Sequence, residues 1–294
     1  MNPISKNEYD LIKQISQRNE LIPYIAKLRK KDLQIGFVPT MGALHEGHLT
    51  LIEQCKQEND ICISSIFINP TQFNDKKDFE KYPRAVDEDV KKLNGTGCDI
   101  VFTPNNDDIY PGYDYSKIII DIGYLDSVLE AKQRPGHFDG VVTVVKKLFD
   151  IVLPHTVYFG QKDYQQYLVI KKLIAYFNYD IKLVLCKTIR ESDGLAMSSR
   201  NRLLNQNERK LAPIIFATLS MAKKLLKEKS IVEVKEWSAN LLRQENLINF
   251  EYFEIVDADT LKPINYLHDA DSILICTAMK IGNVRLIDNI LVKN

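Results

Sequence analysis

The sequence predicts an α/β fold, in which a doubly wound parallel sheet is followed by a smaller α+β domain. Through the first two-thirds of the chain, short β-branched and apolar runs alternate with segments of helical spacing. This alternation is typical of parallel strands joined by helices that cover both faces of a sheet. After about residue 190, helical patterns come first and strand-like runs follow. We therefore expect two domains, residues 1–187 and residues 188–294.

The elements of the first part are expected in alternating order. The expected strands are Leu33–Val38, Ile61–Ile68, Asp99–Phe102, Lys117–Ile122, Thr156–Phe159 and Ile181–Ile189. The expected helices, which carry apolar residues on one face, are His48–Asn59, Asp87–Leu93, Gly140–Val152 and Tyr164–Phe177. In a sheet of this kind, ligands bind beyond the carboxyl ends of the strands.

The elements of the second part begin with a capping-box pattern at Asn205 and Glu208. This pattern opens a helix that we expect to run to about Lys229, and a second helix covers about Val232–Gln244. The strand-like runs that follow are Phe250–Val256, Ser272–Met279 and Asn283–Ile290. Helices followed by strands indicate a small α+β domain.

Composition and charge exclude several classes of protein. The 39 basic and 39 acidic residues give a formal net charge of zero, which argues against a nucleic-acid-binding protein. The five cysteines show no C-x-x-C spacing, which favours reduced thiols and a cytoplasmic setting. The first residues contain no apolar signal-peptide core, and no apolar run approaches the ~20 residues of a membrane span. We therefore expect neither a signal peptide nor a membrane partner.

A first candidate site lies in Phe37–His48, between an expected strand and an expected helix. His45 and His48 are three residues apart, with a glycine between them. Imidazoles and free backbone N–H groups at the first turn of a helix together favour phosphate oxygens. Gly42 and Gly47 would let a nucleotide approach the backbone. The alternative is a chance pair of structural histidines. A metalloprotease zinc site requires histidines four residues apart, which this segment lacks.

A second candidate site, Tyr158–Gln166, also lies between an expected strand and an expected helix. Lys162 supplies a compact positive charge suited to a phosphate, and the sheet topology predicts that it lies on the same rim as the histidines. Asp163 could bind ligand or, more simply, cap the following helix. Gln165 and Gln166 offer amides for hydroxyl or carboxylate groups.

A third candidate is Ile189–Asn201, where Ser198, Ser199 and Arg200 suit a triphosphate. The alternative is an ordinary linker with a turn at Asp193-Gly194. The two serines are not needed to cap the next helix, because Asn205 already does so.

Weaker signals occur elsewhere. Phe67–Phe73 and Arg134–Gly140 have the residue types of a small-molecule pocket, although each alone is typical of a turn. We interpret the acidic group Asp87–Asp89 as a solvated helix start, with Asp89 as a lesser candidate for a position near magnesium. His155 and His268 are assigned to structure.

Five of these segments occur in the order of a known family. The segments resemble those of the bacterial pantoate–β-alanine ligase family, and the resemblance is densest over residues 36–204. They are PTMGALHEGH, FINPTQF, RPGHFDGV, FGQKDYQQ and REXDGLAMSSRN, with Ser192 at X. The resemblance implies an ATP-dependent ligase of the His-x-Gly-His nucleotidyltransferase superfamily. It would join (R)-pantoate to β-alanine through a pantoyl-adenylate and release AMP and pyrophosphate. It also implies Mg²⁺ with ATP, a homodimer, a Rossmann-like catalytic domain and a C-terminal lid.

The resemblance also implies residue roles. His48 would be the proton donor, with His45 and Lys162 as further catalytic residues, and Gln72 and Gln166 would hold pantoate, with Gln72 also beside β-alanine. The ATP-binding residues would be Met41, Gly42, Ala43, Leu44, His45, Glu46, Gly47, His48, Gly160, Gln161, Lys162, Asp163, Ile189, Met197, Ser198, Ser199 and Arg200. Many members of the family have Glu at the position of Gln161.

Two other functions stay open at this point. One is a different nucleotidyltransferase, which would release pyrophosphate without making an amide. The other is a regulatory module that binds nucleotide without catalysis. A tRNA-charging enzyme is disfavoured by the zero net charge and the lack of a basic extension.

Overall fold

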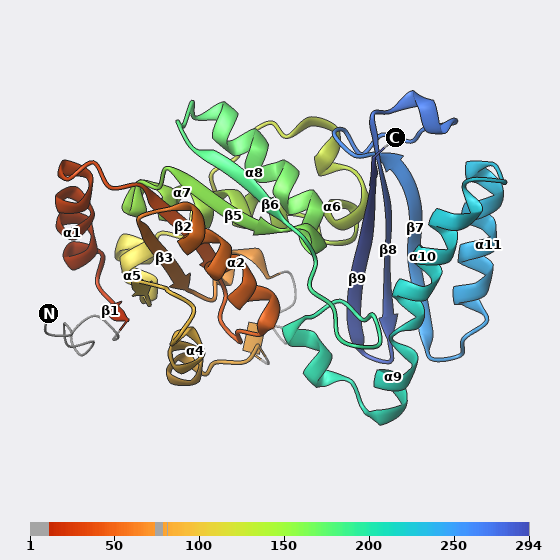
Figure 1. Ribbon diagram of the computed structural model, residues 1–294, viewed down its shortest axis with the longest axis horizontal. Coiled ribbons are helices and arrows are strands. Elements are labelled where there is room, and N and C mark those ends of the chain that lie inside the picture. Colours follow the sequence, from red (N-terminus) through yellow and green to blue (C-terminus); the bar gives the residue numbers. More distant parts are fainter. Residues whose placement is uncertain (1–11, 74–78, 81, 294) are drawn as a thin grey trace, which may run out of the picture. The chain divides into compact units, whose positions relative to one another are not determined.

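The computed structural model describes residues 12–73, 79–80 and 82–293, and it divides into two compact units (Figure 1). Of the described residues, those within 1–121, 135–159 and 169–186 form unit 1, and those within 122–134, 160–168 and 187–294 form unit 2. The domain boundary expected at residue 188 stays a prediction.

Unit 1 is built on a six-stranded sheet with the strand order β1-β4-β3-β2-β5-β6. The strands are β1 (Lys13–Ile15), β2 (Ile35–Thr40), β3 (Ile61–Ile66), β4 (Ile100–Phe102), β5 (Thr156–Gly160) and β6 (Lys182–Cys186). β2 pairs in parallel with β3 on one side and with β5 on the other. Since the central strands are buried on both faces, their sequences are nearly continuous apolar runs.

Helices connect these strands and cover the sheet (Figure 1). They are α1 (Arg18–Lys30), α2 (Glu46–Glu58), α4 (Val86–Leu93), α5 (Asn106–Ile109), α7 (His137–Val152) and α8 (Tyr164–Tyr176). The four helices expected in this part of the chain are confirmed, with ends shifted by a few residues. α1 was not predicted, although Leu21, Ile25 and Leu28 recur at helical spacing and are buried.

One expected strand, Lys117–Ile122, is wrong. The segment carries no strand hydrogen bonds, and the Ile118 N–H donates to the Thr143 hydroxyl of α7 at 2.8 Å. Lys117 donates its ammonium to the Gly136 carbonyl at 2.9 Å. A β-branched run forms a strand only where a neighbouring edge offers it partners, and here side-chain groups take that place.

A core of unit 1 contains several cysteines. Cys55, Cys62, Cys98 and Cys186 pack with aliphatic side chains of β2, β3 and α2. All five cysteines of the chain are buried free thiols, and the fifth, Cys276, lies in unit 2. Because free cysteine behaves as a small hydrophobic side chain, these residues serve here as packing.

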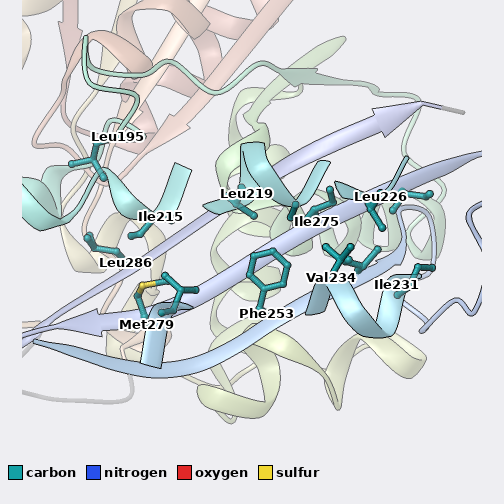
Figure 2. Packing of buried hydrophobic residues seen from close by; sticks show 14 of the residues in the cluster. Leu195, Ile215, Leu219, Leu226, Ile231, Val234, Phe253, Ile275, Met279 and Leu286 are labelled. Atoms are coloured by element: carbon teal, nitrogen blue, oxygen red, sulfur yellow. The ribbon is translucent and has the colours of Figure 1, made fainter. Parts of the chain in front are cut away.

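Unit 2 contains an antiparallel sheet with the order β7-β8-β9, where β7 is Ile248–Asp257, β8 is Ser272–Ile281 and β9 is Val284–Lys293. The three predicted strands are therefore confirmed. The helices of this unit are α6 (Leu129–Gln133), α9 (Gln206–Leu211), α10 (Ile214–Leu225) and α11 (Ile231–Arg243). Figure 2 shows side chains of α10 and α11, such as Leu219 and Val234, directed at Phe253 and Ile275 of the sheet.

The helix expected from Asn205 to about Lys229 is two helices. Asn205 caps α9 as predicted, because its side-chain oxygen accepts from the N–H groups of Asn207 and Glu208 at 2.9 and 3.0 Å. The helix is interrupted at Pro213, which has no N–H to donate to the preceding turn. In the part of the chain that the structure describes, no helix is long and apolar enough to cross a membrane.

Candidate functional site

The loop between β2 and α2 has an unusual backbone. Gly42 and Ala43 have φ angles of 77° and 51°, in the left-handed region. The Gly42 N–H donates to the Thr40 hydroxyl at 3.2 Å. A Cβ at Gly42 would lie 2.9 Å from the Asp89 carboxylate, so the position requires glycine for both conformation and space.

Asp89 accepts hydrogen bonds from the backbone of this loop. Its carboxylate is 1% exposed and accepts from the N–H groups of Ala43 and Leu44, each at 2.7 Å. Lys92 donates to the Leu44 carbonyl at 2.9 Å and lies 3.6 Å from Asp89. The interpretation of Asp89 as part of a solvated helix start is therefore wrong. Asp89 is buried because it accepts hydrogen bonds from backbone N–H groups of a loop about 45 residues earlier in the chain. No local sequence pattern around Asp89 indicates this contact.

His45 and His48 lie side by side at the start of α2. Their ring centroids are 4.1 Å apart, and His45 is the N-cap residue of the helix. The His45 N–H donates to His48 Nδ1 at 3.4 Å, which places the proton of a neutral His48 ring on Nε2. The helix N-terminus and the Nε2–H group suit an anionic ligand.

Gln72 lies beside this loop in unit 1. Its side chain is 7% exposed, and its amide nitrogen lies 2.9 Å from the Met41 sulfur. Asn69, which is 1% exposed, donates to the Gln72 side-chain oxygen at 3.1 Å and to the Gly140 carbonyl at 3.0 Å. Asn69 therefore fixes the orientation of the Gln72 amide, a role that sequence reasoning missed.

Two sequence segments meet at Gln72. His137 donates from Nδ1 to the Gln72 carbonyl at 2.7 Å, and a Cβ at Gly140 would collide with the Thr71 carbonyl oxygen. The FINPTQF and RPGHFDGV segments are thus packed against each other. Burial raises the pKa of Tyr110 to about 12, so its hydroxyl stays protonated and donates to Asn69 at 2.6 Å.

In unit 2, Gly160 leads from β5 into a single turn, Gln161–Asp163. Lys162 lies 3.5 Å from the half-exposed Asp163 carboxylate. Surrounding protein atoms raise the pKa of Asp163, but the charges of Lys162, Arg200 and Arg134 outweigh this effect and hold the pKa below its ordinary value. Three of the sequence segments therefore place cations around one carboxylate.

The turn at Gln161 is anchored to β9. Asn289 donates from its side chain to the carbonyl oxygens of Gln161 and Lys162, both at 2.9 Å. The Gln161 amide donates to the Asn289 side-chain oxygen at 3.2 Å, a bond that a glutamate carboxylate could not donate. Asp288 and Asn289 were not singled out by sequence, since they lie far along the chain from the segments they hold.

The segment Ile189–Met197 turns back on itself. The Met197 N–H donates to the Ile189 carbonyl at 3.0 Å, and Gly194 takes a φ of 92° at the turn. Ser198 accepts from the Arg200 N–H at 3.3 Å and thus caps the short helix Ser199–Leu203, whereas Asn205 caps α9 as expected. Ser199 is buried.

The two adjacent glutamines differ. Gln165 is buried, donates to the carbonyls of Leu125 and Val128 at 2.7 and 3.0 Å, and accepts from the Glu130 N–H at 2.9 Å. Its side-chain amide is therefore hydrogen-bonded to the residues that lead into α6. Gln166, the predicted pantoate-binding residue, is partly exposed.

His155 and His268 lie outside the five quoted segments. His155 Nδ1 accepts from the Ile35 N–H at 2.9 Å, which confirms a structural role. His268 is exposed and stacks on Tyr266 with ring centroids 5.3 Å apart. Among the described residues, no group of three or more acidic, histidine or cysteine side chains could hold a metal ion. Both oxygens of Asp89 are already engaged by N–H groups.

Known proteins are similar to this chain over nearly its whole length. The family profile described as pantoate-beta-alanine ligase matches residues 12–291. The chain is 45% identical to a pantothenate synthetase of Cytophaga hutchinsonii, over 95% of this chain and 98% of that protein. It is 43% identical to one of Caldicellulosiruptor saccharolyticus, over 95% and 99%.

Solved structures are similar as well. A pantothenate synthetase from Thermus thermophilus superimposes with a TM-score of 0.88 at 36% identity, covering 95% of this chain and 99% of that chain. A pantoate-beta-alanine ligase from Francisella tularensis, complexed with beta-gamma ATP and beta-alanine, gives a TM-score of 0.77 at 35% identity, covering 95% and 97%. The α/β fold expected from the sequence, with its smaller C-terminal α+β part, is confirmed.

Proposed function

The chain belongs to the pantoate–β-alanine ligase family, and we propose that it condenses (R)-pantoate with β-alanine, using ATP. The single observation that carries the proposal is the family match over nearly the whole chain, in which the five quoted segments all lie. The products are pantothenate, AMP and pyrophosphate.

In the proposed first step, a carboxylate oxygen of pantoate attacks the α-phosphorus of ATP. A new P–O bond forms, the bond to the β-phosphate oxygen breaks, and pyrophosphate leaves with the electron pair. The step is needed because a carboxylate does not react with an amine at neutral pH. It yields a pantoyl-adenylate, whose AMP group can leave.

In the proposed second step, the neutral amine of β-alanine attacks the carbonyl carbon of this mixed anhydride. The C–N bond forms, the bond to the AMP oxygen breaks, and the nitrogen loses a proton as the amide forms. The protein contributes by holding both reactants close together and by excluding water. No protein nucleophile takes part.

The residues of unit 1 have distinct proposed roles. His48 donates a hydrogen bond or proton from Nε2 to phosphate oxygens that gain charge, and His45 assists it at the N-terminus of α2. Two further features support the pantoate site. The Gln72 amide is held in one orientation by Asn69, and Gln72 lies against Met41 of the proposed ATP loop. Amides with fixed direction select for substrate hydroxyl groups.

The residues of unit 2 are proposed to bind ATP as well. Lys162 and Arg200 supply positive charge for phosphate oxygens, together with the hydroxyls of Ser198 and Ser199. Asp163 stays ionised near neutral pH and accepts hydrogen bonds from hydroxyl groups. Gln166 is proposed to contact pantoate. The backbone groups of Gly160, Ile189 and Met197 complete the ATP-binding set.

Magnesium is proposed to enter bound to ATP, as part of the substrate. This fits the described residues, which offer no ligand cluster of their own, because Mg²⁺ is commonly held by phosphates and water with few protein ligands. We also propose a cytoplasmic homodimer, with a C-terminal part that acts as a lid. Size-exclusion chromatography with light scattering tests the dimer, and scattering with and without ATP and pantoate tests the lid.

The test of the reaction is pyrophosphate release from MgATP, with pantoate and β-alanine added singly and together. We expect release with pantoate alone, limited to about one turnover per site, and continuous release with AMP and amide when β-alanine is present. Release that is independent of pantoate would instead indicate a different nucleotidyltransferase. ATP binding without any release would indicate a regulatory module.

A further inference from the structure

The side-chain carboxamide of Asn289, on β9, forms hydrogen bonds to one turn of the chain, Gln161–Asp163. Its side chain is 3% exposed, and its nitrogen lies 2.9 Å from both the Gln161 and the Lys162 carbonyl oxygens. Carbonyl oxygens only accept, so the nitrogen rather than the oxygen must face them, and both of its hydrogens are used. The oxygen accepts from the Gln161 amide at 3.2 Å.

The neighbouring residue anchors a second segment. Asp288, also 3% exposed, receives two hydrogen bonds from the Arg190 guanidinium, at 2.6 and 3.0 Å. The Asn289 N–H donates to Asp288 at 2.7 Å, and Arg190 also donates to the Asn289 carbonyl at 3.3 Å. Phe216 lies under the guanidinium, 3.8 Å from its ring centroid.

The turn that carries Lys162 depends on these bonds. Gln161–Asp163 is a single three-residue turn between a strand and a helix. A turn this short can close few hydrogen bonds of its own. The carbonyls on which Asn289 acts belong to Lys162 itself and to the residue before it. Their position therefore sets where the Lys162 side chain starts and how far its ammonium can reach.

We propose that Asn289 is a positioning residue for Lys162, fixing its turn on β9 so that the ammonium meets the phosphates of ATP. The inference rests on the proposed function, since it requires that Lys162 binds ATP. Charge stabilisation of a reacting phosphate depends on groups held in place before the reaction, and small displacements cost rate. Arg190 and Asp288 hold the proposed ATP segment Ile189–Met197 on the same strand.

The most informative variant is Asn289→Asp. It keeps the volume of the side chain but replaces the two donor hydrogens by an oxygen that faces two carbonyl oxygens. The new carboxylate also stands next to the buried Asp288. The anchor is therefore lost, while the Lys162 side chain itself is unchanged.

The experiment is a double-mutant cycle of Asn289→Asp with Lys162→Ala, read as kcat/KM for ATP in continuous pyrophosphate release with pantoate and β-alanine both present. In the native background, we expect Asn289→Asp to lower kcat/KM about 10- to 100-fold. In the Lys162→Ala background, we expect less than about a twofold further loss, because the group that Asn289 positions is gone. KM for β-alanine should not change.

The matched control is Asn249→Asp, an equal charge change at an exposed position of β7 in the same sheet. It should leave kcat/KM within about twofold of the native value. Thermal unfolding is measured for every variant, and if Asn289→Asp does not fold, Asn289→Ser takes its place in the cycle.

Three outcomes would overturn the inference. Equal losses in both backgrounds would mean that Asn289 acts on the fold as a whole and not through Lys162. No loss from Asn289→Asp, with Lys162→Ala strongly impaired, would refute the anchor and leave the proposed function standing. A native activity of Lys162→Ala would refute the assignment of Lys162 and the inference with it, whereas absent pyrophosphate release by the native protein would refute the proposed function.

Discussion

Replacing the carboxylate of Asp89 should lower both the stability of unit 1 and the efficiency with which the protein uses ATP. Asp89→Asn preserves the size of a side chain that is 1% exposed but leaves only one acceptor oxygen for two N–H groups. Its NH₂ group would face the N–H of either Ala43 or Leu44. The substitution also removes the negative charge 3.6 Å from the Lys92 ammonium. The perturbation is therefore confined to one loop of unit 1.

The magnitude follows from these two bonds. A hydrogen bond to a charged group contributes about 1.5–3 kcal/mol, and an unsatisfied buried donor costs a similar amount. Allowing for partial relaxation, we expect Asp89→Asn to lower the free energy of unfolding by about 2–4 kcal/mol. For a protein unit of this size, this corresponds to a midpoint lower by roughly 4–16 °C.

The assay combines calorimetry or urea unfolding with the KM for ATP in pyrophosphate release. Because the loop carries the proposed ATP-binding residues, we expect kcat/KM for ATP to fall about tenfold or more. The control is Asp87→Asn, an exposed carboxylate in the first turn of the same helix α4. An Asp89→Asn protein within about 0.5 kcal/mol of the native stability, with an unchanged KM for ATP, would refute the reasoning.

Further predictions concern other parts of the two units. His48→Ala should lower turnover about 10²–10³-fold with folding intact, and a loss of about tenfold or less in steady-state rate would contradict its role. Gln72→Ala and Gly140→Ala should both raise KM for pantoate, the second because its Cβ would collide with the Thr71 carbonyl oxygen beside Gln72; an unchanged KM would remove Gln72 from the pocket. Arg285→Ala should destabilise the protein by about 3–5 kcal/mol in urea unfolding, since the buried Glu130 loses the two bonds that Arg285 donates, at 2.6 and 2.8 Å, and keeps only the one from the Tyr252 hydroxyl; a loss below about 1 kcal/mol would count against this. Burial raises the pKa of Glu130, but Arg285 and Tyr252 outweigh it and hold the pKa below its ordinary value. Stability is therefore present above the ordinary glutamate pKa and lost as pH falls through the lowered one, and Glu130→Gln should flatten this acid limb of the unfolding free energy; an unchanged slope would refute it.

Local sequence patterns predicted most elements, because their causes are local. The paired strands of the central sheet are apolar runs, and Asn205 caps a helix through its own neighbours. Lys117–Ile122 shows the limit of such reasoning, since its β-branched residues say nothing about whether a strand edge is available. Pro213 was the visible signal for the break between α9 and α10, and the helical spacing on both sides obscured it.

For the site, the sequence predicted residue types but not their supports. The histidine pair and the Gln161–Asp163 turn lie at strand-to-helix junctions, which is where topology places ligand-binding groups. Asp89, Asn69 and Asn289 act across 46, 71 and 128 positions of the chain. Contacts at that separation depend on the folded backbone, so no periodicity or spacing can reveal them.

The buried cysteines allow local unfolding of each unit to be followed by thiol labelling. A thiol reagent can modify a cysteine only when the surrounding core opens, because the thiolate must form and be reached. Cys55, Cys62, Cys98 and Cys186 lie in unit 1, and Cys276 lies in unit 2, where burial raises its pKa strongly. Labelling followed by peptide mass spectrometry therefore times the opening of each unit separately, with no introduced probe.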